Sequence, residues 1–529
     1  MTMEEEAFGI GHGDEILWNS NIPPLLILIP ILFSTIFILR SHLKKKNNNN
    51  NKPTFPLPPG PWKLPIIGNI HQLAAPTSAG VPIHRRFADL AKRYGPVMHL
   101  KLGETSNVFV SSPESAREFL KTHDHNFSSR PYMPSAEIIF YGAKDIAFCS
   151  EGEYLRRMRK ICTMELLSEK RVKQLRPIRE DEVNKLMKLL SSSAAGEAVN
   201  LSRLVVSVGN TMTSRAAFGK IRELEGSFLP VMHRILQALN GFNVGDIFPS
   251  SRLLRRISGA ERLMKKLHEE ADGILQEILD EHVSRRRRRA EGENRAAAED
   301  DEEDLVDVLL NCTDNHLEVK AVVLDIFLAG GDTSPIVIEW VMSELMKNPE
   351  VMEKVQREVR HVFDGKGKVM DEAYFSKLHY LKLVIKETFR LHPPVALLIP
   401  RECRETVVVD GYQIPAKTRV FVNSWAIGRD PKHWTDPERF LPERFLDSSV
   451  DYKGSDFQLL PFGAGRRMCL GMNYGIAVVH LLLANLLYHF DWKLPNEMKP
   501  EDLDMFEDSG GTLPRKNSLC LIPIPYHAT

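Results

Sequence analysis

Residues 462–471 read Phe-Gly-Ala-Gly-Arg-Arg-Met-Cys-Leu-Gly, and this stretch decides what kind of protein the chain forms. Cys469 lies between glycines and an arginine, directly before an apolar stretch at 472–490 that predicts a buried helix. The partial positive charge at the N-terminus of that helix favours a thiolate over a thiol. We therefore interpret Cys469 as a metal ligand and expect its thiolate to bind a heme iron from the proximal side.

The neighbours of Cys469 support the same interpretation. Gly465 and Gly471 carry no Cβ, so a large flat cofactor can approach the backbone closely. Arg467 supplies a fixed cation that suits a cofactor carboxylate. The alternative is that Cys469 is a small buried hydrophobic residue, as most free cysteines are. The full spacing of the segment, Phe-x-x-Gly-x-Arg-x-Cys-x-Gly, argues against that alternative.

The segment resembles the heme-binding loop of the cytochrome P450 enzymes, the heme-thiolate monooxygenases, and residues 55–529 resemble the plant members of that family. The resemblance implies the cytochrome P450 fold, mainly α with small β-sheets, in a single large catalytic domain. It also implies heme b as cofactor, with NADPH used indirectly through NADPH-cytochrome P450 reductase, and O2 and a small apolar molecule as substrates. The loop residues that it assigns to the cofactor are Phe462, Gly465, Arg467, Cys469 and Gly471.

Composition narrows the remaining classes. The 529 residues have a formal net charge of zero, which gives no support for a nucleic-acid partner. The six cysteines are scattered, without a CxxC pair. This pattern suits a reducing compartment and predicts no zinc cluster.

The N-terminal part predicts a membrane anchor. Ile22–Leu39 is uncharged and apolar, with acidic residues before it and basic residues after it, so the positive-inside rule places residues 40 onward in the cytosol. A cleaved secretory signal is the alternative, but the flanking charges are reversed and no Ala-x-Ala site follows. We expect a short lumenal segment (1–21), a single-pass anchor (22–39), a linker with a proline-rich hinge (40–61) and the catalytic domain (62–529), at the endoplasmic reticulum membrane.

Long helical patterns dominate the catalytic region. Apolar residues recur at helical spacing over 251–289 and 317–347. A basic block at 285–289 runs into an acidic block at 291–304, which is typical of a solvated loop between two helices, with a partner-docking patch as the alternative. Short strands are expected at 97–102, 108–110, 406–409 and 419–422.

The sequence Ala-Gly-Gly-Asp-Thr-Ser at 329–334 falls inside the long helical pattern. Two glycines within a helix each cost about 1 kcal/mol relative to alanine, and we interpret them as room for a ligand against the backbone. Asp332 and Thr333 place an acid beside an alcohol, a pair that can relay protons during oxygen activation. The segment is similar to the oxygen-activation motif of the family, so both residues are predicted to be catalytic. Capping of a broken helix is the alternative.

Pro335 departs from the small residue that the plant enzymes have at this position. Because proline lacks an N–H, it frees the carbonyl of Gly331 four residues earlier. We hypothesise that Pro335 enforces a kink that makes room for oxygen and water. Full coupling of oxygen consumption to product in a Pro335→Ala variant would contradict this.

Three charged residues are expected to hold the cysteine loop in place. Glu387 and Arg390 have the i, i+3 spacing that puts both on one helix face. The segment 440–445, Phe-Leu-Pro-Glu-Arg-Phe, resembles a second motif of the family, whose arginine is Arg444 here. The resemblance implies that Glu387, Arg390 and Arg444 form a buried structural network.

The heme propionates require cations. Arg467 is the first candidate, and Arg159 matches the arginine of the family's Trp-x-x-x-Arg motif, with Leu155 in place of the tryptophan. Arg130 and Arg401 match further family cations by position. For each arginine a plain surface charge is the alternative. Leu155 removes one propionate donor, and Leu470 stands where the plant loop commonly has proline.

Substrate contacts are expected around 132–148, 328–331, 395–399 and 508–513. Segment 395–399 is wholly aliphatic, which favours a hydrocarbon-like ligand oriented by shape, although a core strand is the alternative. Residues 241–249 resemble plant enzymes that oxidise terpenoids and alkaloids. We therefore predict insertion of one oxygen atom from O2 into a C–H bond of a terpenoid, either a sesquiterpene or a diterpene.

Other functions stay open at this point. One is an alkaloid or phenolic hydroxylase of the same family. Another is a heme-thiolate isomerase or dehydratase that uses neither O2 nor reductase, against which Asp332 and Thr333 argue. The third is a heme protein without turnover, against which the open sixth coordination position argues.

Overall fold

The structure is a computed structural model, and it describes residues 55–73, 80–193, 196–219, 225–239, 242–291, 303–364, 372–508 and 510–526. The predicted membrane anchor at 22–39 lies outside the described residues, as does most of the acidic block at 291–304.

Helices and strands occur throughout these residues. The helices are α2 (Ile70–Leu73), α3 (Ile83–Tyr94), α4 (Pro113–Arg117), α5 (Pro134–Ile139), α6 (Glu153–Ile161), α7 (Glu169–Gln174), α8 (Arg176–Ser192), α9 (Leu201–Phe218), α10 (Glu225–Ala238), α11 (Val244–Ile247), α12 (Arg252–Ile257), α13 (Ala260–Ala290), α14 (Leu305–Cys312), α15 (His316–Lys347), α16 (Pro349–Phe363), α17 (His379–Leu391), α18 (Ser424–Ile427) and α19 (Met472–His489). The strands are β1 (Val97–Leu102), β2 (Thr105–Val110), β3 (Val199–Asn200), β4 (Arg401–Glu402), β5 (Val407–Val409), β6 (Tyr412–Ile414), β7 (Arg419–Val422), β8 (Phe490–Lys493) and β9 (Cys520–Pro525).

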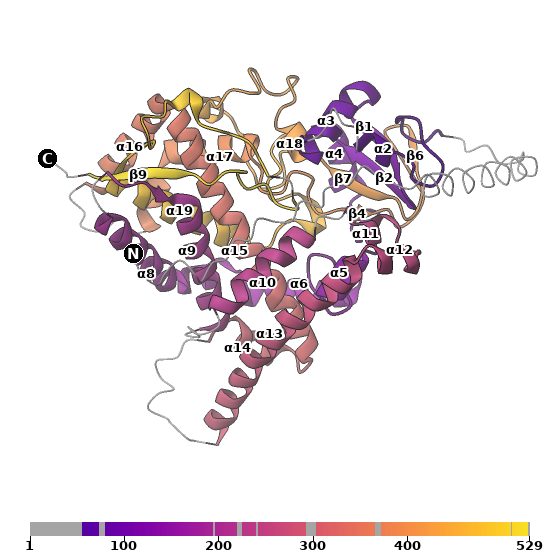
Figure 1. Ribbon diagram of the computed structural model, residues 1–529, viewed down its shortest axis with the longest axis horizontal. Coiled ribbons are helices and arrows are strands. Elements are labelled where there is room, and N and C mark those ends of the chain that lie inside the picture. Colours follow the sequence, from indigo (N-terminus) through magenta and orange to yellow (C-terminus); the bar gives the residue numbers. More distant parts are fainter. Residues whose placement is uncertain are drawn as a thin grey trace, which may run out of the picture.

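The fold is mainly α with small sheets, as predicted. Figure 1 shows the long helices α8, α9, α15, α16, α17 and α19 on one side and a smaller region with β1, β2 and β7 on the other, where α2, α3 and α4 also lie. The largest described sheet has the order β1-β2-β7-β4, in which β2 and β7 are parallel and the other pairs antiparallel. A second sheet has the order β3-β9-β8, and β5 and β6 form a hairpin. Asp410 and Gly411 connect this hairpin with positive φ angles, which two-residue hairpin turns favour.

Most expected boundaries are confirmed and a few are wrong. Strands 97–102 and 419–422 match β1 and β7, whereas β2 begins three residues before the expected position. The expected helix at 251–289 is two helices, because the chain turns at Gly259, whose φ is +71°. The basic block at 285–289 belongs to the last turns of α13 rather than to a loop.

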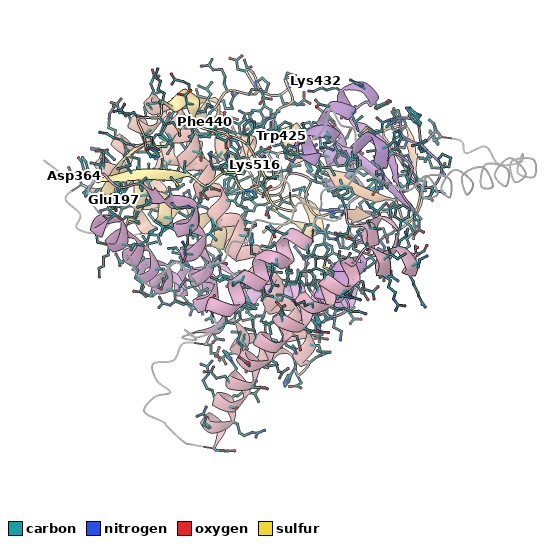
Figure 2. All side chains as sticks on the ribbon, viewed as in Figure 1. Glu197, Asp364, Trp425, Lys432, Phe440 and Lys516 are labelled. Atoms are coloured by element: carbon teal, nitrogen blue, oxygen red, sulfur yellow. The ribbon has the colours of Figure 1, made fainter. Side chains whose placement is uncertain are left out.

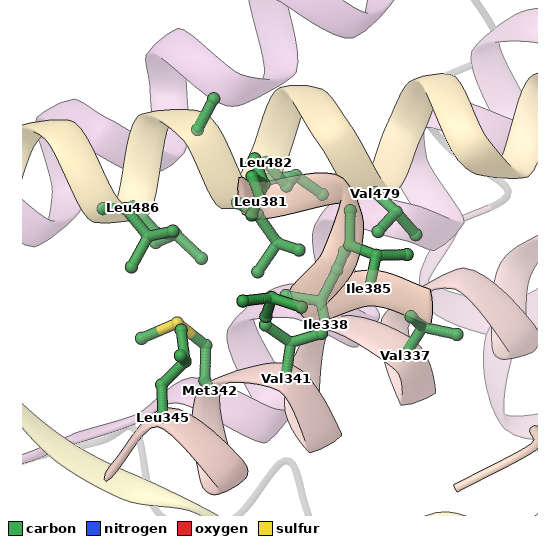
Figure 3. Packing of buried hydrophobic residues seen from close by; sticks show 14 of the residues in the cluster. Val337, Ile338, Val341, Met342, Leu345, Leu381, Ile385, Val479, Leu482 and Leu486 are labelled. Carbon is green, nitrogen blue, oxygen red and sulfur yellow. The ribbon is translucent and has the colours of Figure 1, made fainter. Parts of the chain in front are cut away.

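The main core lies where α15, α17 and α19 meet (Figure 3). Five buried residues follow the i, i+1, i+4, i+5, i+8 pattern of one helix face on α15, namely Val337, Ile338, Val341, Met342 and Leu345. They pack against residues of α17 and α19 that include Leu381, Ile385, Val479, Leu482 and Leu486. Each such burial contributes roughly 1.5–3 kcal/mol, so this core fixes the helix that carries Asp332 and Thr333.

Among the described residues, α15 is the one helix long and apolar enough to cross a membrane. Two thirds of its most apolar window is buried inside the protein, at 67%. Its apolar character is therefore that of a central core helix.

Glycines allow α9 to pack closely on α15. A Cβ at Gly331 would overlap the Asn210 amide oxygen of α9, and one at Gly330 would lie 3.3 Å from Thr213 Cγ2. Both Cβ positions face α9, so the two glycines serve helix packing in addition to the room for a ligand that the sequence interpretation assigned to them. Helix α15 is continuous through Pro335, whose buried ring also faces α9.

Trp425, labelled in Figure 2, joins the region of β1 and β2 to the helical region. Its indole Nε1 donates to Glu507, 3.1 Å away, and its ring lies beneath the guanidinium groups of Arg85 and Arg429. Glu507 also accepts from His84 of α3 at 2.9 Å. This buried polar contact fixes α3 against the C-terminal part of the chain.

Candidate active site

A cavity of about 300 Å³ lies against α15 and the cysteine loop. It is lined by predicted site residues from both sides, namely Arg130, Arg159, Thr333, Arg401, Phe462, Arg467, Cys469 and Gly471. Residues up to about 340 positions apart in the sequence (Arg130 and Gly471) are thus brought to one space. Gly465 and Asp332, which were also predicted site residues, do not line this cavity.

The loop presents the Cys469 thiol to the cavity. Its backbone is held by hydrogen bonds from Cys469 N to Phe462 O (3.0 Å) and from Met468 N to Gly465 O (3.0 Å). Burial raises the pKa of Cys469, while the N–H groups of Gly471 and Met472 and the cation of Arg159 lower it. The helix N-terminus therefore favours the thiolate, as expected, but its effect on the pKa is smaller than the opposing effect of burial. A metal cation bound to the sulfur would supply the missing stabilisation of the thiolate.

Gly465 and Gly471 of the loop are glycine for different structural reasons. Gly465 has a φ of +67°, and a Cβ there would overlap the carbonyl oxygen of Leu120. Glycine is therefore required here for the turn and for packing against Leu120. At Gly471 a Cβ would lie 3.9 Å from the Cys469 sulfur, so this position borders the ligand atom, in line with the prediction.

Four arginines surround the cavity. Burial lowers the pKa of Arg130, Arg159, Arg401 and Arg467, and repulsion from neighbouring arginines adds to this effect for all except Arg159. The pKa of Arg467 falls to about 10. A cluster of buried cations fits a cofactor with two carboxylates, because such a group would relieve the repulsion. Together with the accessible thiol, the donor set fits heme b.

Hydrogen bonds to backbone carbonyls orient these arginines. Arg467 Nε donates to Ser128 O at 2.6 Å, and Arg130 Nη1 donates to Ile399 O at 2.7 Å. Arg401 pairs with Asp124 at 2.8 Å and also donates to the carbonyl of Ala464 in the loop. Arg159 donates to Met468 O at 2.9 Å, so it braces the residue before the thiol.

Two of the three departures from the plant pattern, Leu155 and Leu470, have different surroundings. Leu155 is 1% exposed, packs in the core beside α13 and α15, and does not line the cavity. Leu470 does line the cavity. Leu155 therefore contributes to the packing of the core, and it gives the cavity no hydrogen-bond donor.

The predicted charge network has the expected geometry. Arg390 binds Glu387 through two contacts, Nε to Oε2 at 2.7 Å and Nη2 to Oε1 at 2.8 Å, and Arg444 Nε lies 3.0 Å from Oε1. The side chains of Glu387 and Arg390 are fully buried, at 0% exposure. Arg390 also donates to the carbonyls of Gly428 and Pro437, so the network ties α17 to the loop at 428–445.

Phe389 connects this network to the cysteine loop. It lies on α17 between Glu387 and Arg390, and its ring contacts Phe462 edge to face with centroids 5.3 Å apart. Tyr452 contacts both rings. Displacement of α17 would therefore move the start of the loop.

Asp332 and Thr333 face different spaces. Thr333 lines the cavity of Cys469 and donates its hydroxyl to Ala329 O at 2.9 Å. Asp332 lines a second cavity on the side of α9 and α10. Burial raises the pKa of Asp332, while Thr512 and His233 lower it. The two residues are adjacent in sequence, as a relay requires, but their side chains are not directed into one cavity.

Three of the four expected substrate segments line the cavity. Ile146 and Ala147 come from 132–148, Ala329 and Gly330 from α15, and an aliphatic wall from 395–399. Segment 395–399 is irregular rather than a strand, and Leu398 in it has a φ of +49°. The described residues of 508–513 do not line it. They support it instead, because Leu513 N donates to Pro394 O at 2.9 Å.

The sequence analysis missed Asp325, an acid that lines the cavity. Its Oδ2 accepts from the N–H groups of Ile146 (3.1 Å) and Ala147 (3.0 Å), and burial raises its pKa to about 6. Asp325 precedes Thr333 by eight residues, so the two share a helix face. That spacing could have identified it.

Comparisons with known proteins agree with this geometry. Residues 58–521 match the family described as cytochrome P450. Cytochrome P450 71D10 of Glycine max is 50% identical over 482 residues, which cover 89% of this chain and 92% of that protein. Premnaspirodiene oxygenase of Hyoscyamus muticus is 46% identical, covering 89% and 93%. A solved zebrafish cytochrome P450 with abiraterone superposes with a TM-score of 0.69 at 25% identity, covering 84% of this chain and all of that one.

Proposed function

The chain belongs to the cytochrome P450 family of heme-thiolate monooxygenases, and from this premise we propose that it oxidises an apolar plant terpenoid. The substrate would be a sesquiterpene or a diterpene, and one oxygen atom from O2 would enter a C–H bond. NADPH-cytochrome P450 reductase would supply the electrons. Terpenoid-oxidising enzymes among the relatives support the proposal.

The observation that carries the substrate class is the aliphatic wall of the cavity that Cys469 also lines. Val395, Leu398 and Ile399 line the cavity together with Ile146 and Ala147. Such a wall orients a hydrocarbon by shape and excludes water. Among the described lining residues the one carboxylate is Asp325, and its Oδ2 is engaged by two backbone N–H groups. This disfavours a protonated amine, and with it an alkaloid.

Each predicted site residue then has a proposed part. Cys469 would hold the heme iron through its thiolate, and Arg130, Arg159, Arg401 and Arg467 would hold the heme propionates. Bound heme supplies the activation of O2. Thr333 holds a proton at its hydroxyl on the cavity side, and Asp332, whose side chain must rotate from the second cavity to reach it, restores that proton. Glu387, Arg390 and Arg444 keep the loop in position.

Feeding experiments with microsomes test the proposal. Microsomes that contain this protein and a plant reductase would receive a sesquiterpene hydrocarbon, a diterpene, an alkaloid or a phenolic compound, with ¹⁸O2 and with or without NADPH. We expect NADPH-dependent incorporation of one ¹⁸O atom into a terpenoid. Oxidation of the alkaloid or phenolic compound alone would contradict the substrate class, and product without NADPH would favour an isomerase or dehydratase. A reduced protein that binds no carbon monoxide would favour a heme protein without turnover.

We also propose that residues 22–39 anchor the enzyme in the endoplasmic reticulum membrane with the catalytic domain in the cytosol. The uncharged stretch Ile22–Leu39 and its flanking charges support this. Protease added to intact microsomes should digest the catalytic domain. A protected domain would contradict the orientation.

A further inference from the structure

Asp124 is a half-buried carboxylate between Arg401 and the cysteine loop. It follows the short helical turn Glu118–Thr122, and its Oδ1 lies 2.8 Å from Arg401 Nη1. Among the residues that the structure describes, it is the one carboxylate that forms an ion pair with any of the four cavity arginines. The other three arginines donate to backbone carbonyls. Burial lowers the pKa of Arg401 and Asp124 opposes this effect, so the protein itself supplies part of the balancing charge.

The other carboxylate oxygen of Asp124 binds the cysteine loop. Asp124 Oδ2 accepts a hydrogen bond from the backbone N–H of Arg466 at 3.0 Å, three residues before Cys469. The guanidinium group of Arg466 is exposed, and its Nε lies 3.5 Å from the same oxygen. Because an exposed ion pair contributes little, the backbone hydrogen bond is the contact that fixes the loop.

Gly465 allows the carboxylate to come this close. A Cβ at Gly465 would lie 2.6 Å from Asp124 Oδ1, so a larger residue would displace the carboxylate. Arg401 also donates to the carbonyl of Ala464, beside this glycine. The contacts therefore form a closed ring, in which Asp124 binds Arg401, Arg401 binds the loop and the loop binds Asp124. A shift of the carboxylate would move the cation and the loop together.

The chain around Asp124 is fixed by contacts outside this ring. Asn126 Nδ2 donates to Glu405 O at 2.8 Å, and Glu405 N donates to Asn126 Oδ1 at 2.9 Å. Arg404 N donates to Asn126 O at 3.0 Å. These bonds hold the segment that contains Asp124 beside the segment that contains Arg401. Contacts of the backbone, and not the ion pair alone, therefore set the position of the carboxylate.

We propose that Asp124 is a positioning residue that holds the cysteine loop and, through its charge beside Arg401, lowers the reduction potential of bound heme. Four arginines face a cofactor with two carboxylates, so the site has an excess of positive charge that one further anion reduces. Positive charge favours the added electron, and its partial neutralisation therefore disfavours reduction. This rests on the proposed heme-binding roles of Cys469 and Arg401, and it is independent of the substrate class.

Spectroelectrochemistry of the holoenzyme provides the first test. Asp124→Asn removes the charge and keeps an oxygen that can accept from the loop. At a fixed potential we expect its ferrous-to-ferric ratio to rise roughly tenfold, which is about 59 mV for one electron. Glu118→Gln is the control, because Glu118 is also half-buried but pairs with His123. An unchanged ratio in Asp124→Asn, or an equal rise in Glu118→Gln, would overturn the proposal.

Amide hydrogen exchange provides the second test, in peptides that contain Arg466. Asp124→Ala removes the acceptor as well as the charge, so exchange of the Arg466 N–H should become roughly tenfold faster or more. Heme should also transfer faster from this variant to excess apomyoglobin. Asp124→Asn should exchange nearly as slowly as wild type, and so should Arg466→Gln, which loses only the exposed side-chain charge. Wild-type exchange in Asp124→Ala would overturn the proposal.

Loss of heme from the variant is tested separately. If Asp124→Ala is purified without heme, titration with hemin measures its affinity through the thiolate-heme Soret band. Weaker binding than wild type, by a chain with a native circular dichroism spectrum, supports the proposal, and wild-type affinity overturns it. If the wild-type protein itself shows no such band, the proposed heme site fails, whereas exchange of the Arg466 amide still decides whether Asp124 holds the loop.

Discussion

The ring of Pro335 on α15 packs against Gly209 on α9, so closely that a Cβ at position 209 would lie 2.6 Å from Pro335 Cγ. The proline that departs from the plant pattern is thus matched by a glycine on the neighbouring helix. Its ring faces α9 and lines neither of the two cavities.

Gly209→Ala should therefore destabilise the protein. The added methyl overlaps the proline ring, and overpacking of this kind costs about 1–3 kcal/mol of unfolding free energy. Pro335→Ala in the same background should recover much of the loss, because it removes the overlapping atoms. A double-mutant cycle by denaturant unfolding measures the coupling, which should exceed about 0.5 kcal/mol.

Gly273 provides the matched control for this cycle. It lies on the exposed face of α13, where an added Cβ meets nothing within 4 Å. Gly273→Ala should stabilise the helix by up to about 1 kcal/mol through propensity alone. If Gly209→Ala behaves like Gly273→Ala, the packing of Pro335 on α9 is wrong.

Cys469→Ser should abolish the thiolate-heme signature. A serine oxygen at this position cannot give the strongly red-shifted Soret band of the reduced carbon monoxide complex. Cys403→Ser is the control, because Cys403 is fully buried near β7 and away from the cavity, with its sulfur 3.0 Å from Glu405 O. That variant should keep the band. Retention of the band in Cys469→Ser, or its loss in Cys403→Ser, would contradict the assignment.

Motif spacing together with the resemblance to the family predicted that Cys469, Arg467 and Thr333 share one site and that Glu387 binds Arg444, and the structure has both. These predictions succeeded because each motif fixes residue types on one loop or helix face. The directions of side chains were harder to predict. Gly331 and Gly465 are required by packing against Asn210 and Leu120, and no pattern within α15 or the loop specifies those neighbours.

The spacing of Asp325 and Thr333 places both on one helix face, but the partners of buried carboxylates could not be predicted from the sequence. Asp325 lies in an apolar stretch of α15, and its charge is accommodated by N–H groups of Ile146 and Ala147, some 180 residues earlier in the chain. Likewise Asp332 faces the second cavity because α9 and α10 cover that side of α15. Such contacts arise from tertiary packing, which helical periodicity does not encode.

Glu387→Ala should prevent stable heme incorporation. It leaves the buried guanidinium groups of Arg390 and Arg444 without their shared carboxylate, and breaking a buried pair costs about 3–5 kcal/mol. The heme-to-protein absorbance ratio after purification measures the effect. Glu353→Ala on α16 is the control, because Glu353 and Arg357 form an exposed i, i+4 pair worth about 0.3–0.5 kcal/mol. A normal heme ratio in Glu387→Ala would contradict the structural role.

Asp325→Asn should change how stability depends on pH. Burial raises the pKa of Asp325 from 3.8 to about 6, so between these values the folded protein holds a proton that the unfolded chain has released. The folded state is therefore penalised increasingly as the pH rises from about 4 to about 6, by at most about 3 kcal/mol, and the penalty is constant above that. Asparagine cannot ionise, so the folded state of the variant does not lose stability in this way as the pH rises.

The difference in thermal unfolding midpoint between Asp325→Asn and wild type should accordingly shift in favour of the variant over pH 4 to 6 and stay level from pH 6.5 to 8. The side-chain amide N–H groups of asparagine lack partners here, and this costs unfolding free energy. That cost is independent of pH, so it shifts the plot of the midpoint difference against pH by a constant amount. Asp89→Asn is the control, since Asp89 is exposed beside Lys92 and its change should give a nearly constant difference. A constant difference for Asp325→Asn as well would mean that this carboxyl titrates normally, and that the cavity wall beside Thr333 is more accessible to water than the packing of Ile146 and Ala147 indicates.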